Sequence, residues 1–319
     1  MERLRISAEG ISAEVWTLGA ALNALEVTGP DGPVSVVLGH PSEADRRASK
    51  ACLGETVGPY ANRIAEARFI LDGRTHQLER SFRSRHALHS GSAGFHRQDW
   101  EVLERGDDRV RLGLTWRDTT GEHPGPVHAE IIYTVSPRVL EYEIAVTSEV
   151  ATVVNVVGHP YANLAGSGDV LGHTLQIPAS AYVPVDDDAI PTPEAPAPVA
   201  GTTYDLRQPR ALRDLTADGP GLDHCFLPDG DGFRDVAVLA DPASGRRLTI
   251  ATDLPGLQVY MGQELDDSVV TMQGPAVPYA GVALETQQLP DAPNRPDFPS
   301  TVLRPGEVRR SRTRWTITS

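Results

Sequence analysis

The sequence predicts an all-β fold, a large antiparallel β-sandwich or barrel with few short helices. Three segments, 110–116, 127–135 and 140–147, alternate apolar and polar residues with a period of two. Such alternation is typical of a strand with one buried face, because successive side chains point to opposite faces of a sheet. The 29 glycines and 26 prolines interrupt the chain too often for long helices.

The three predicted strands follow one another with short polar connections, as in an antiparallel meander. A further hairpin is predicted over 236–250, with its turn at 241–245. A short strand over 68–71 precedes another tight turn. Residues 41–47 favour a short helix with a proline near its first turn.

We expect residues 1–319 to form a single domain, because no clear boundary interrupts the strand patterns. The strongest interruption is 183–199, which holds five prolines and an aspartate triplet at 186–188. This stretch could be an extended linker, but a surface excursion of one domain fits better, since strands are predicted on both sides. Consecutive aspartates on an extended strand do not all face one ion, so a solvated turn is favoured over a cation site.

The charge balance restricts the partners that the protein can bind. Lys and Arg number 29 against 43 Asp and Glu, which gives a formal net charge of −14. Nucleic acid and anionic membranes require a basic surface, so we expect neither as a partner, and a small neutral ligand fits better. No apolar window is long enough to span a membrane, and no signal peptide is visible, so we expect a cytoplasmic protein.

The cysteines and clustered histidines do not indicate a metal site. Cys52 and Cys225 give no disulfide framework, and each is expected to be a free buried thiol. His86, His89 and His96 lie in a loop rich in glycine and serine, but their spacing matches no common zinc motif. A loop that places His89 against a ligand is the better interpretation.

Two side chains suited to proton transfer follow apolar runs. Glu285 comes after 282–284 and before a loop with several prolines, so the strand is expected to end there. His159 follows the apolar run 153–157. An imidazole and a carboxylate can together donate and accept protons near neutrality. Each alone could instead be structural, His159 as a satisfied buried histidine and Glu285 as a solvated strand-end charge.

Three further side chains are suited to binding a polar ligand. Arg63 offers a planar fork of donors, Asp223 an acceptor, and Gln258 both a donor and an acceptor. Arg63 could also pair with a surface acid. A nucleophile at Cys225 is disfavoured, because nothing indicates the electropositive setting that a thiolate needs. The chain lacks a phosphate loop, a dinucleotide-binding glycine motif and a nucleophile elbow, so a neutral polyol is the best ligand class.

Six ordered motifs resemble the aldose 1-epimerases, the galactose mutarotase family, and the similarity covers nearly the whole chain. The motifs are Gly58-Pro59-Tyr60-Ala61-Asn62-Arg63-Ile64, Leu88-His89-Ser90-Gly91, Gly158-His159-Pro160-Tyr161-Ala162-Asn163-Leu164-Ala165-Gly166, Leu222-Asp223-His224, Pro255-Gly256-Leu257-Gln258-Val259-Tyr260 and Leu284-Glu285-Thr286-Gln287. The resemblance implies one large galactose mutarotase-type β-sandwich. It implies interconversion of the α and β anomers of a free aldose such as galactose or glucose, with no cofactor. We expect a monomer or homodimer.

The resemblance also implies roles for individual residues. Glu285 would be the general base and His159 the general acid, and the sugar would be held by Asn62, Arg63, His89, Asp223 and Gln258. Opening a hemiacetal ring requires removal of the O1 proton and protonation of the ring oxygen O5. We therefore expect an ionised carboxylate and a protonated imidazole on opposite sides of the C1–O5 bond.

The chain departs from the family pattern at several positions expected to line or support the site. Arg, a second Gly, Asn and an aromatic residue are usual where this chain has Pro59, Ser90, Gly158 and Ala162, and Tyr and Asn are common where it has Leu222 and Cys225. These departures predict a wider and less polar pocket, and they leave the substrate open.

Two other functions remain open on the sequence alone. The fold could use the His159 and Glu285 pair for a different proton transfer, on a non-sugar or modified-sugar metabolite. Alternatively, it could bind carbohydrate without catalysis, although binding alone needs no paired acid and base. A hexose-phosphate substrate is disfavoured, because no additional basic cluster is placed for a phosphate.

Overall fold

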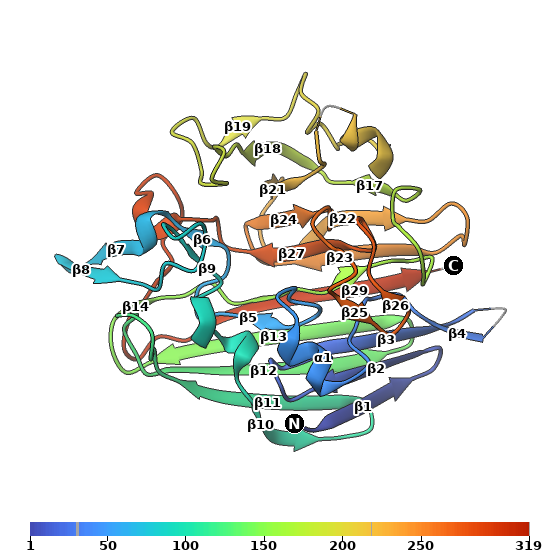
Figure 1. The fold of residues 1–319 in the computed structure, drawn as a ribbon, viewed down its shortest axis with the longest axis horizontal. Helices are drawn as coiled ribbons and strands as arrows, with labels where there is room; N and C mark the ends of the chain where they lie inside the picture. The colour runs from blue at the N-terminus through green and yellow to red at the C-terminus, as the bar shows by residue number, and fades with distance from the viewer. Residues whose placement is uncertain (30–31, 218, 319) are drawn as a thin grey trace.

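The computed structural model describes residues 1–29, 32–217 and 219–318, and most of its secondary structure is antiparallel sheet (Figure 1). The largest sheet has nine strands. In spatial order they are β10 (Glu101–Arg105), β11 (Arg109–Trp116), β12 (Val127–Ser136), β13 (Val139–Ser148), β29 (Arg309–Thr318), β23 (Arg247–Thr252), β22 (Arg234–Ala240), β17 (Thr174–Gln176) and β20 (Arg210–Ala211).

Two smaller sheets pack against the nine-stranded sheet. One contains β1 (Arg3–Ala8), β2 (Ile11–Trp16), β3 (Ala21–Gly29) and β4 (Gly32–Ser35). The other contains β16 (Tyr161–Ala162), β27 (Val282–Gln287), β24 (Gly256–Tyr260), β21 (Asp223–Pro228), β18 (Ala179–Val183) and β19 (Ala197–Pro198). The first lies over β11 and β12 at one end of the molecule, and the hairpin of β18 and β19 lies at the other end (Figure 1).

Short strand pairs and helices connect these sheets. The pairs are β14 (Thr152–Val153) with β28 (Val302–Leu303), β15 (Val157–Gly158) with β5 (Thr56–Val57), β25 (Val270–Thr271) with β26 (Gly274–Pro275), β6 (Arg63–Ile64) with β9 (Ala87–Leu88), and β7 (Arg68–Leu71) with β8 (Arg74–Gln77). The helices are α1 (Glu43–Ala48) and the 3-10 turns η1 (Ala65–Ala67), η2 (Gly91–Ala93), η3 (Phe95–Arg97), η4 (Leu212–Thr216) and η5 (Ala292–Asn294).

The core lies between the sheet layers and is shared by all three large sheets. One hydrophobic cluster includes Leu4 of β1, Ile131 of β12 and Leu284 of β27, each almost completely buried. Burial of apolar surface on this scale is the main force holding the layers together. A hydrogen bond also crosses the layers, because the Oγ1 atoms of Thr286 in β27 and Thr313 in β29 lie 2.6 Å apart and are buried.

The predicted all-β sandwich is confirmed, and so are its main elements. The meander is present as β11, β12 and β13, which pair in sequence along their length. The 236–250 hairpin is present as β22 and β23. The predicted short helix is α1, although it begins at Glu43, because the Ser42 side chain caps it by accepting a bond from the Asp45 amide.

Residues 183–199 leave the sheet and return to it, as a surface excursion would. Tyr182 of β18 pairs with Ala197 of β19, so the two ends of the stretch are adjacent strands. Within it, the Asp186 carboxylate accepts bonds from the amides of Asp188 and Ile190, which closes a turn. Asp188 also pairs with arginine side chains of the 80–86 loop, so the aspartates are held by protein groups.

Candidate active site

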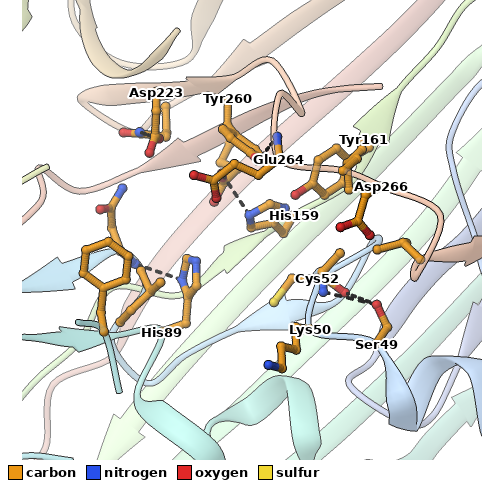
Figure 2. A pocket seen from close by; sticks show the side chains of 18 of the residues that line it. Ser49, Lys50, Cys52, His89, His159, Tyr161, Asp223, Tyr260, Glu264 and Asp266 are labelled. Carbon is orange, nitrogen blue, oxygen red and sulfur yellow. Dashed lines mark hydrogen bonds and ion pairs between the residues drawn. The ribbon is translucent and has the colours of Figure 1, made fainter. Parts of the chain in front are cut away.

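One cleft of about 650 Å³ brings together all seven residues predicted for the site. They are Asn62, Arg63, His89, His159, Asp223, Gln258 and Glu285. They come from segments spread over more than two hundred residues of the chain, and the sheets bring them to one place. Figure 2 shows His159 near the middle of the cleft, with Asp223 and His89 toward one side and Ser49 and Asp266 toward the other.

Strand β27 carries Glu285 in its interior, so the prediction that the strand ends at this residue is wrong. The ladder continues for two residues, because Thr286 and Gln287 still pair with β24, and the prolines begin only at Pro290. Side chains alternate along the strand: Val282 and Leu284 enter the core, whereas Glu285 faces the cleft. The main chain before and after Glu285 is thereby held in the pairing of β27 with β24.

The same alternation aligns polar groups from neighbouring strands. In β24, Leu257 and Val259 belong to the core, whereas Gln258 and Tyr260 face the cleft. Gln258 is the direct cross-strand partner of Glu285. Because paired residues in adjacent strands share a face, the register of β24 on β27 places an amide beside the carboxylate.

The next row of the sheet completes the floor of the cleft. Tyr260 pairs with Asp223 of β21 on one side and with Ala283 of β27 on the other. Ala283 in turn pairs with Tyr161 of β16. This row therefore places a carboxylate, a phenol, a methyl group and a second phenol side by side. Ala283 itself is buried in a core cluster, and the rings of Tyr161 and Tyr260 lie edge to face with their centres 6.0 Å apart.

His159 and Glu285 are in direct contact. His159 Nε2 lies 3.2 Å from Glu285 Oε1, and the two side chains are only 6% and 3% exposed. Burial lowers the pKa of His159 to about 4 and raises the pKa of Glu285 well above its ordinary value, with the nearby Asp223 adding to the second shift. The other carboxylate oxygen, Oε2, is buried with no hydrogen-bond partner among the described residues. The pair can therefore exchange a proton and still accept one from a ligand.

His89 is fixed as a hydrogen-bond donor into the cleft. Its Nδ1 accepts a hydrogen bond of 3.1 Å from the main-chain amide of Asn62, so in the neutral ring the hydrogen lies on Nε2. Burial, with the neighbouring His159, holds the pKa of His89 well below its ordinary value. Asn62 and His89 both have positive φ, 64° and 56°, a conformation that costs non-glycine residues energy. Such backbone strain at two lining residues is typical of a functional site.

A chain of side-chain hydrogen bonds runs along the cleft. Arg63 Nη2 donates to Asp223 Oδ2 at 3.1 Å, and Gln258 Nε2 donates to Asp223 Oδ1 at 2.6 Å. Gln287 then donates to Gln258 at 3.3 Å, and Asn62 donates to Gln287 at 3.5 Å. Each member orients the next, so the donors and acceptors are set before a ligand enters. The Phe82 ring also lies against the Arg63 guanidinium, 4.7 Å from its centre.

The loop after β27 supports the site from behind. The Asp291 amide donates to the Arg63 carbonyl, and the Asp291 carboxylate accepts from the Ala65 amide. The strand that carries Arg63 is therefore bonded to the 290–299 loop. Asn155 has a similar part, because its side chain bonds both the Ala61 carbonyl and the Gln288 amide. In the sequence analysis, Asn155 was only part of the apolar run 153–157 and had no such role.

Part of the cleft wall was not predicted. Residues 48–52 and 264–269 lie in two loops and contribute the lining residues Ser49, Lys50, Cys52, Glu264 and Asp266, among others. Tyr161 and Tyr260 were quoted within motifs but not named as lining residues. Alternation with the core residues Val259 and Ala162 was the signal that could have identified both tyrosines. The two loops carry no comparable periodicity.

The positions that depart from the family pattern lie behind the lining of the cleft in this chain. None of Pro59, Ser90, Gly158, Ala162, Leu222 and Cys225 lines the cleft. Ala162 and Leu222 belong to the core, and Ser90 bonds both the amide and the carbonyl of Tyr60. A Cβ at Gly158 would meet the Tyr142 ring in the core. These positions can therefore support the site from behind, and the wider, less polar pocket stays a prediction.

Metal clusters and membrane-spanning helices are absent from the described part of the chain. Within residues 1–29, 32–217 and 219–318, no group of three or more His, Cys, Asp or Glu side chains could hold a metal ion. Both cysteines are free and buried, as predicted. No helix in the described part of the chain is long and apolar enough to cross a membrane.

Comparison with known proteins identifies the family. The model of the aldose 1-epimerase family matches residues 2–316. The chain belongs to the aldose 1-epimerase family. Its sequence is 35% identical to rat galactose mutarotase over 316 residues, which covers 96% of this chain and 91% of the rat protein. It is 34% identical to the aldose 1-epimerase of Escherichia coli over 323 residues, which covers 96% and 92% of the two chains.

Solved structures of aldose epimerases have the same fold. The aldose epimerase homologue from C. elegans superposes with a TM-score of 0.94 at 27% identity and covers 99% of this chain and 98% of its own. Galactose 1-epimerase from Lactobacillus acidophilus gives a TM-score of 0.84 at 26% identity, with coverage of 97% and 91%. The predicted galactose mutarotase-type sandwich is thus confirmed, and membership of this family makes the protein an isomerase.

Proposed function

We propose that this aldose 1-epimerase family member interconverts the α and β anomers of a free aldose such as galactose or glucose. The observation that carries the proposal is the buried contact of 3.2 Å between His159 and Glu285 in a cleft lined by donors and acceptors. Family membership and the polar lining favour this activity over proton transfer on a non-sugar metabolite. A purely binding function leaves the buried acid–base pair without a purpose.

Ring opening needs only two proton movements in this site. Glu285, which lines the cleft, takes the proton from O1 as the C1–O1 bond becomes a carbonyl. His159 gives a proton to O5 as the C1–O5 bond breaks. Rotation about C1–C2 turns the other face of the carbonyl toward O5, and the reverse transfers close the ring as the other anomer. Each positioned proton transfer contributes about 10²–10⁴ in rate.

The arrangement of the two groups differs from the sequence expectation. His159 and Glu285 are in direct contact instead of facing each other across a gap wide enough for the C1–O5 bond. O1 and O5 are bonded to the same carbon, so an acid and a base that lie side by side can serve both oxygens.

The remaining predicted residues are proposed to hold the sugar hydroxyls. Asp223 can accept from one hydroxyl or share a vicinal pair with Arg63, since the two are already bonded at 3.1 Å. Gln258 and Asn62 extend this hydrogen-bonding surface, and His89 donates from Nε2. Uncharged hydroxyl groups suit this mixture of donors and acceptors because each hydroxyl both donates and accepts.

Two broader features are also proposed. A single domain is supported by the hydrophobic cluster, whose members range from Leu4 to Ile317. A cytoplasmic location is supported by the free thiols of Cys52 and Cys225, because reduced cysteines are usual there.

Polarimetry of freshly dissolved α-galactose and α-glucose tests the proposed activity. The wild-type protein should accelerate mutarotation above the buffer rate, and the variants Glu285→Gln and His159→Asn should each lower kcat by at least about 100-fold. The matched controls are His128→Asn and Glu149→Gln, because His128 and Glu149 form a similar contact of 3.3 Å on the surface. No acceleration of any common aldose by the wild-type protein would overturn the proposal, and so would full activity of Glu285→Gln.

A further inference from the structure

A buried ion pair lies behind one wall of the cleft and outside the residues that line it. Arg46 Nη1 and Glu55 Oε1 are 2.8 Å apart, and the side chains are 1% and 3% exposed. Arg46 lies in α1, and Glu55 immediately precedes β5. Burying two charges is costly, and removing one partner alone leaves an uncompensated charge. Neither residue contacts the cleft, so the proposed sugar chemistry does not explain why they are charged.

Arg46 is held rigidly by groups from several elements. Its Nη2 donates to the Asn23 side chain at 2.9 Å and to the Leu53 carbonyl at 3.3 Å. The guanidinium also lies over the Trp16 ring, 4.9 Å from its centre. Asn23 belongs to β3 and Trp16 to β2, so Arg46 is anchored on the four-stranded sheet. A residue with this many fixed contacts can transmit position to its partner.

The pair closes the base of the loop that forms the wall. Ser49, Lys50 and Cys52, which line the cleft in Figure 2, all lie between Arg46 and Glu55 in the chain. The ion pair and the Arg46 bond to the Leu53 carbonyl tie the two ends of this loop together. The wall is therefore fixed at its base and not only by its own contacts.

The backbone around Glu55 also holds His159. The His159 amide donates to the Glu55 carbonyl at 2.9 Å, and the Gly54 amide donates to the His159 carbonyl at 3.0 Å. The ladder continues as Thr56 pairs with Gly158. The amide and the carbonyl of His159 are thus both bonded to residues 54–55, and Arg46 holds this segment through the Glu55 side chain.

We propose that the Arg46 and Glu55 pair positions His159 and thereby sets its imidazole in contact with Glu285. This proposal rests on the proposed function, in which His159 is the acid. A displacement of about 1 Å at a reacting group can cost about 100-fold in rate, so a buried anchor one hydrogen bond away from that group has a large effect on kcat. Neither Arg46 nor Glu55 touches the substrate.

The first test shortens the anchor and compares it with an isosteric change. Glu55→Asp retains the charge but draws the segment toward Arg46, whereas Glu55→Gln retains the length and can still accept a bond from Arg46. We expect Glu55→Asp to lower kcat for galactose by at least about tenfold with KM within about threefold, and Glu55→Gln to stay within about threefold of wild type in both. A folded Glu55→Asp variant with wild-type kcat would overturn the proposal.

The second test separates positioning from stability. The double variant Arg46→Met/Glu55→Leu replaces the pair by apolar groups of similar volume, which is often neutral for stability. We expect a thermal midpoint close to that of wild type and a kcat lowered by at least about tenfold. The matched control, Arg304→Met/Asp72→Leu, removes an exposed pair and should leave kcat unchanged. A stable double variant with wild-type kcat would show that the pair is only structural and would overturn the proposal.

A readout without turnover keeps this proposal distinct from the proposed function. The His159 ring resonances, assigned by their loss in His159→Asn, should shift in Glu55→Asp and not in the Arg304 and Asp72 control. If the wild-type protein accelerates no aldose but these resonances shift, the proposed function fails and the positioning of His159 stands. Unchanged resonances in Glu55→Asp would overturn the positioning itself.

Discussion

The contact between His159 and Glu285 leads to a specific prediction for the pH dependence of activity. Burial lowers the pKa of His159 to about 4 and raises the pKa of Glu285 well above its ordinary value. At a pH between these two pKa values, the His159 side chain and the Glu285 carboxyl group together hold one titratable proton. Neutral imidazole with neutral carboxyl and imidazolium with carboxylate contain the same number of protons, so pH does not change the balance between them. The sequence expectation of an ionised Glu285 and a protonated His159 is therefore one of two forms of a single protonation state.

The direction of each limb follows from this proton count. As the pH falls through about 4, the pair takes a second proton, no base remains for O1, and kcat/KM should fall about tenfold per pH unit. Above that limb, kcat/KM should fall only when the shared proton is lost, and burial places that loss well above the ordinary carboxyl pKa. An exposed histidine with a pKa of about 6.5 would instead lose its own proton near that pH. The two cases differ in the pH at which the His159 ring titrates.

Initial rates of mutarotation, measured by polarimetry from pH 3.5 to 9 with the buffer rate subtracted, give the profile of kcat/KM for the free enzyme. Circular dichroism at each pH confirms that the protein stays folded. We expect a single acid limb near pH 4, and we expect the His159 ring resonances to titrate on that limb and not near 6.5. A descending limb near 6.5 on which these resonances titrate would refute the reasoning, because it would show that burial does not control the protonation of His159.

Two further predictions concern the core and the rim of the cleft. Thr286→Val should destabilise the fold by about 1–3 kcal/mol in urea denaturation, because the buried Thr313 hydroxyl loses its bond of 2.6 Å and keeps only a longer contact of 3.4 Å with the Thr252 hydroxyl. Thr286→Val/Thr313→Val should be closer to wild type, and equal losses of stability in both variants would contradict this. Glu264 and Asp266 are exposed residues of the cleft lining, which contains one lysine, Lys50, so the wild-type enzyme should use galactose 6-phosphate less efficiently than galactose. Glu264→Lys/Asp266→Lys should bring the kcat/KM values for the two sugars closer together at low salt, and an unchanged ratio would exclude this electrostatic selection.

Local patterns were sufficient to predict the parts of the fold in which burial alternates strictly. The meander of β11, β12 and β13 has one face in the core and one in water, so the period of two is visible in the sequence. Strand β27 is buried on both faces, and its polar end, Glu285 to Gln287, resembles the start of a loop. The prediction therefore ended the strand too early, because two-sided burial removes the alternation on which it relied.

Six of the seven site residues were singled out from local motifs, whereas Asn62 and the individual roles came from the family resemblance. The local motifs alone left His159, Glu285 and Arg63 each with a structural alternative. What decides between those alternatives is the register of strands distant in the chain, such as Gln258 beside Glu285, which no local pattern encodes. The walls at 48–52 and 264–269 were missed for the same reason. Gly158 and Ala162 were predicted to line or support the pocket because adjacent residues line it. Ala162 instead belongs to the core, and a Cβ at Gly158 would meet the Tyr142 ring.

The arrangement of the cleft floor in rows across β21, β24 and β27 separates two routes by which such a protein can diverge. Inserting or deleting one residue in these strands would turn the side chains to the opposite face of the sheet and move Glu285 from the cleft into the core. The chemistry can therefore evolve only by substitution at fixed positions. The loops at 49–52 and 264–269 have no such constraint and can change in length. Lineages could therefore acquire new substrates by remodelling loops while the acid–base pair stays intact.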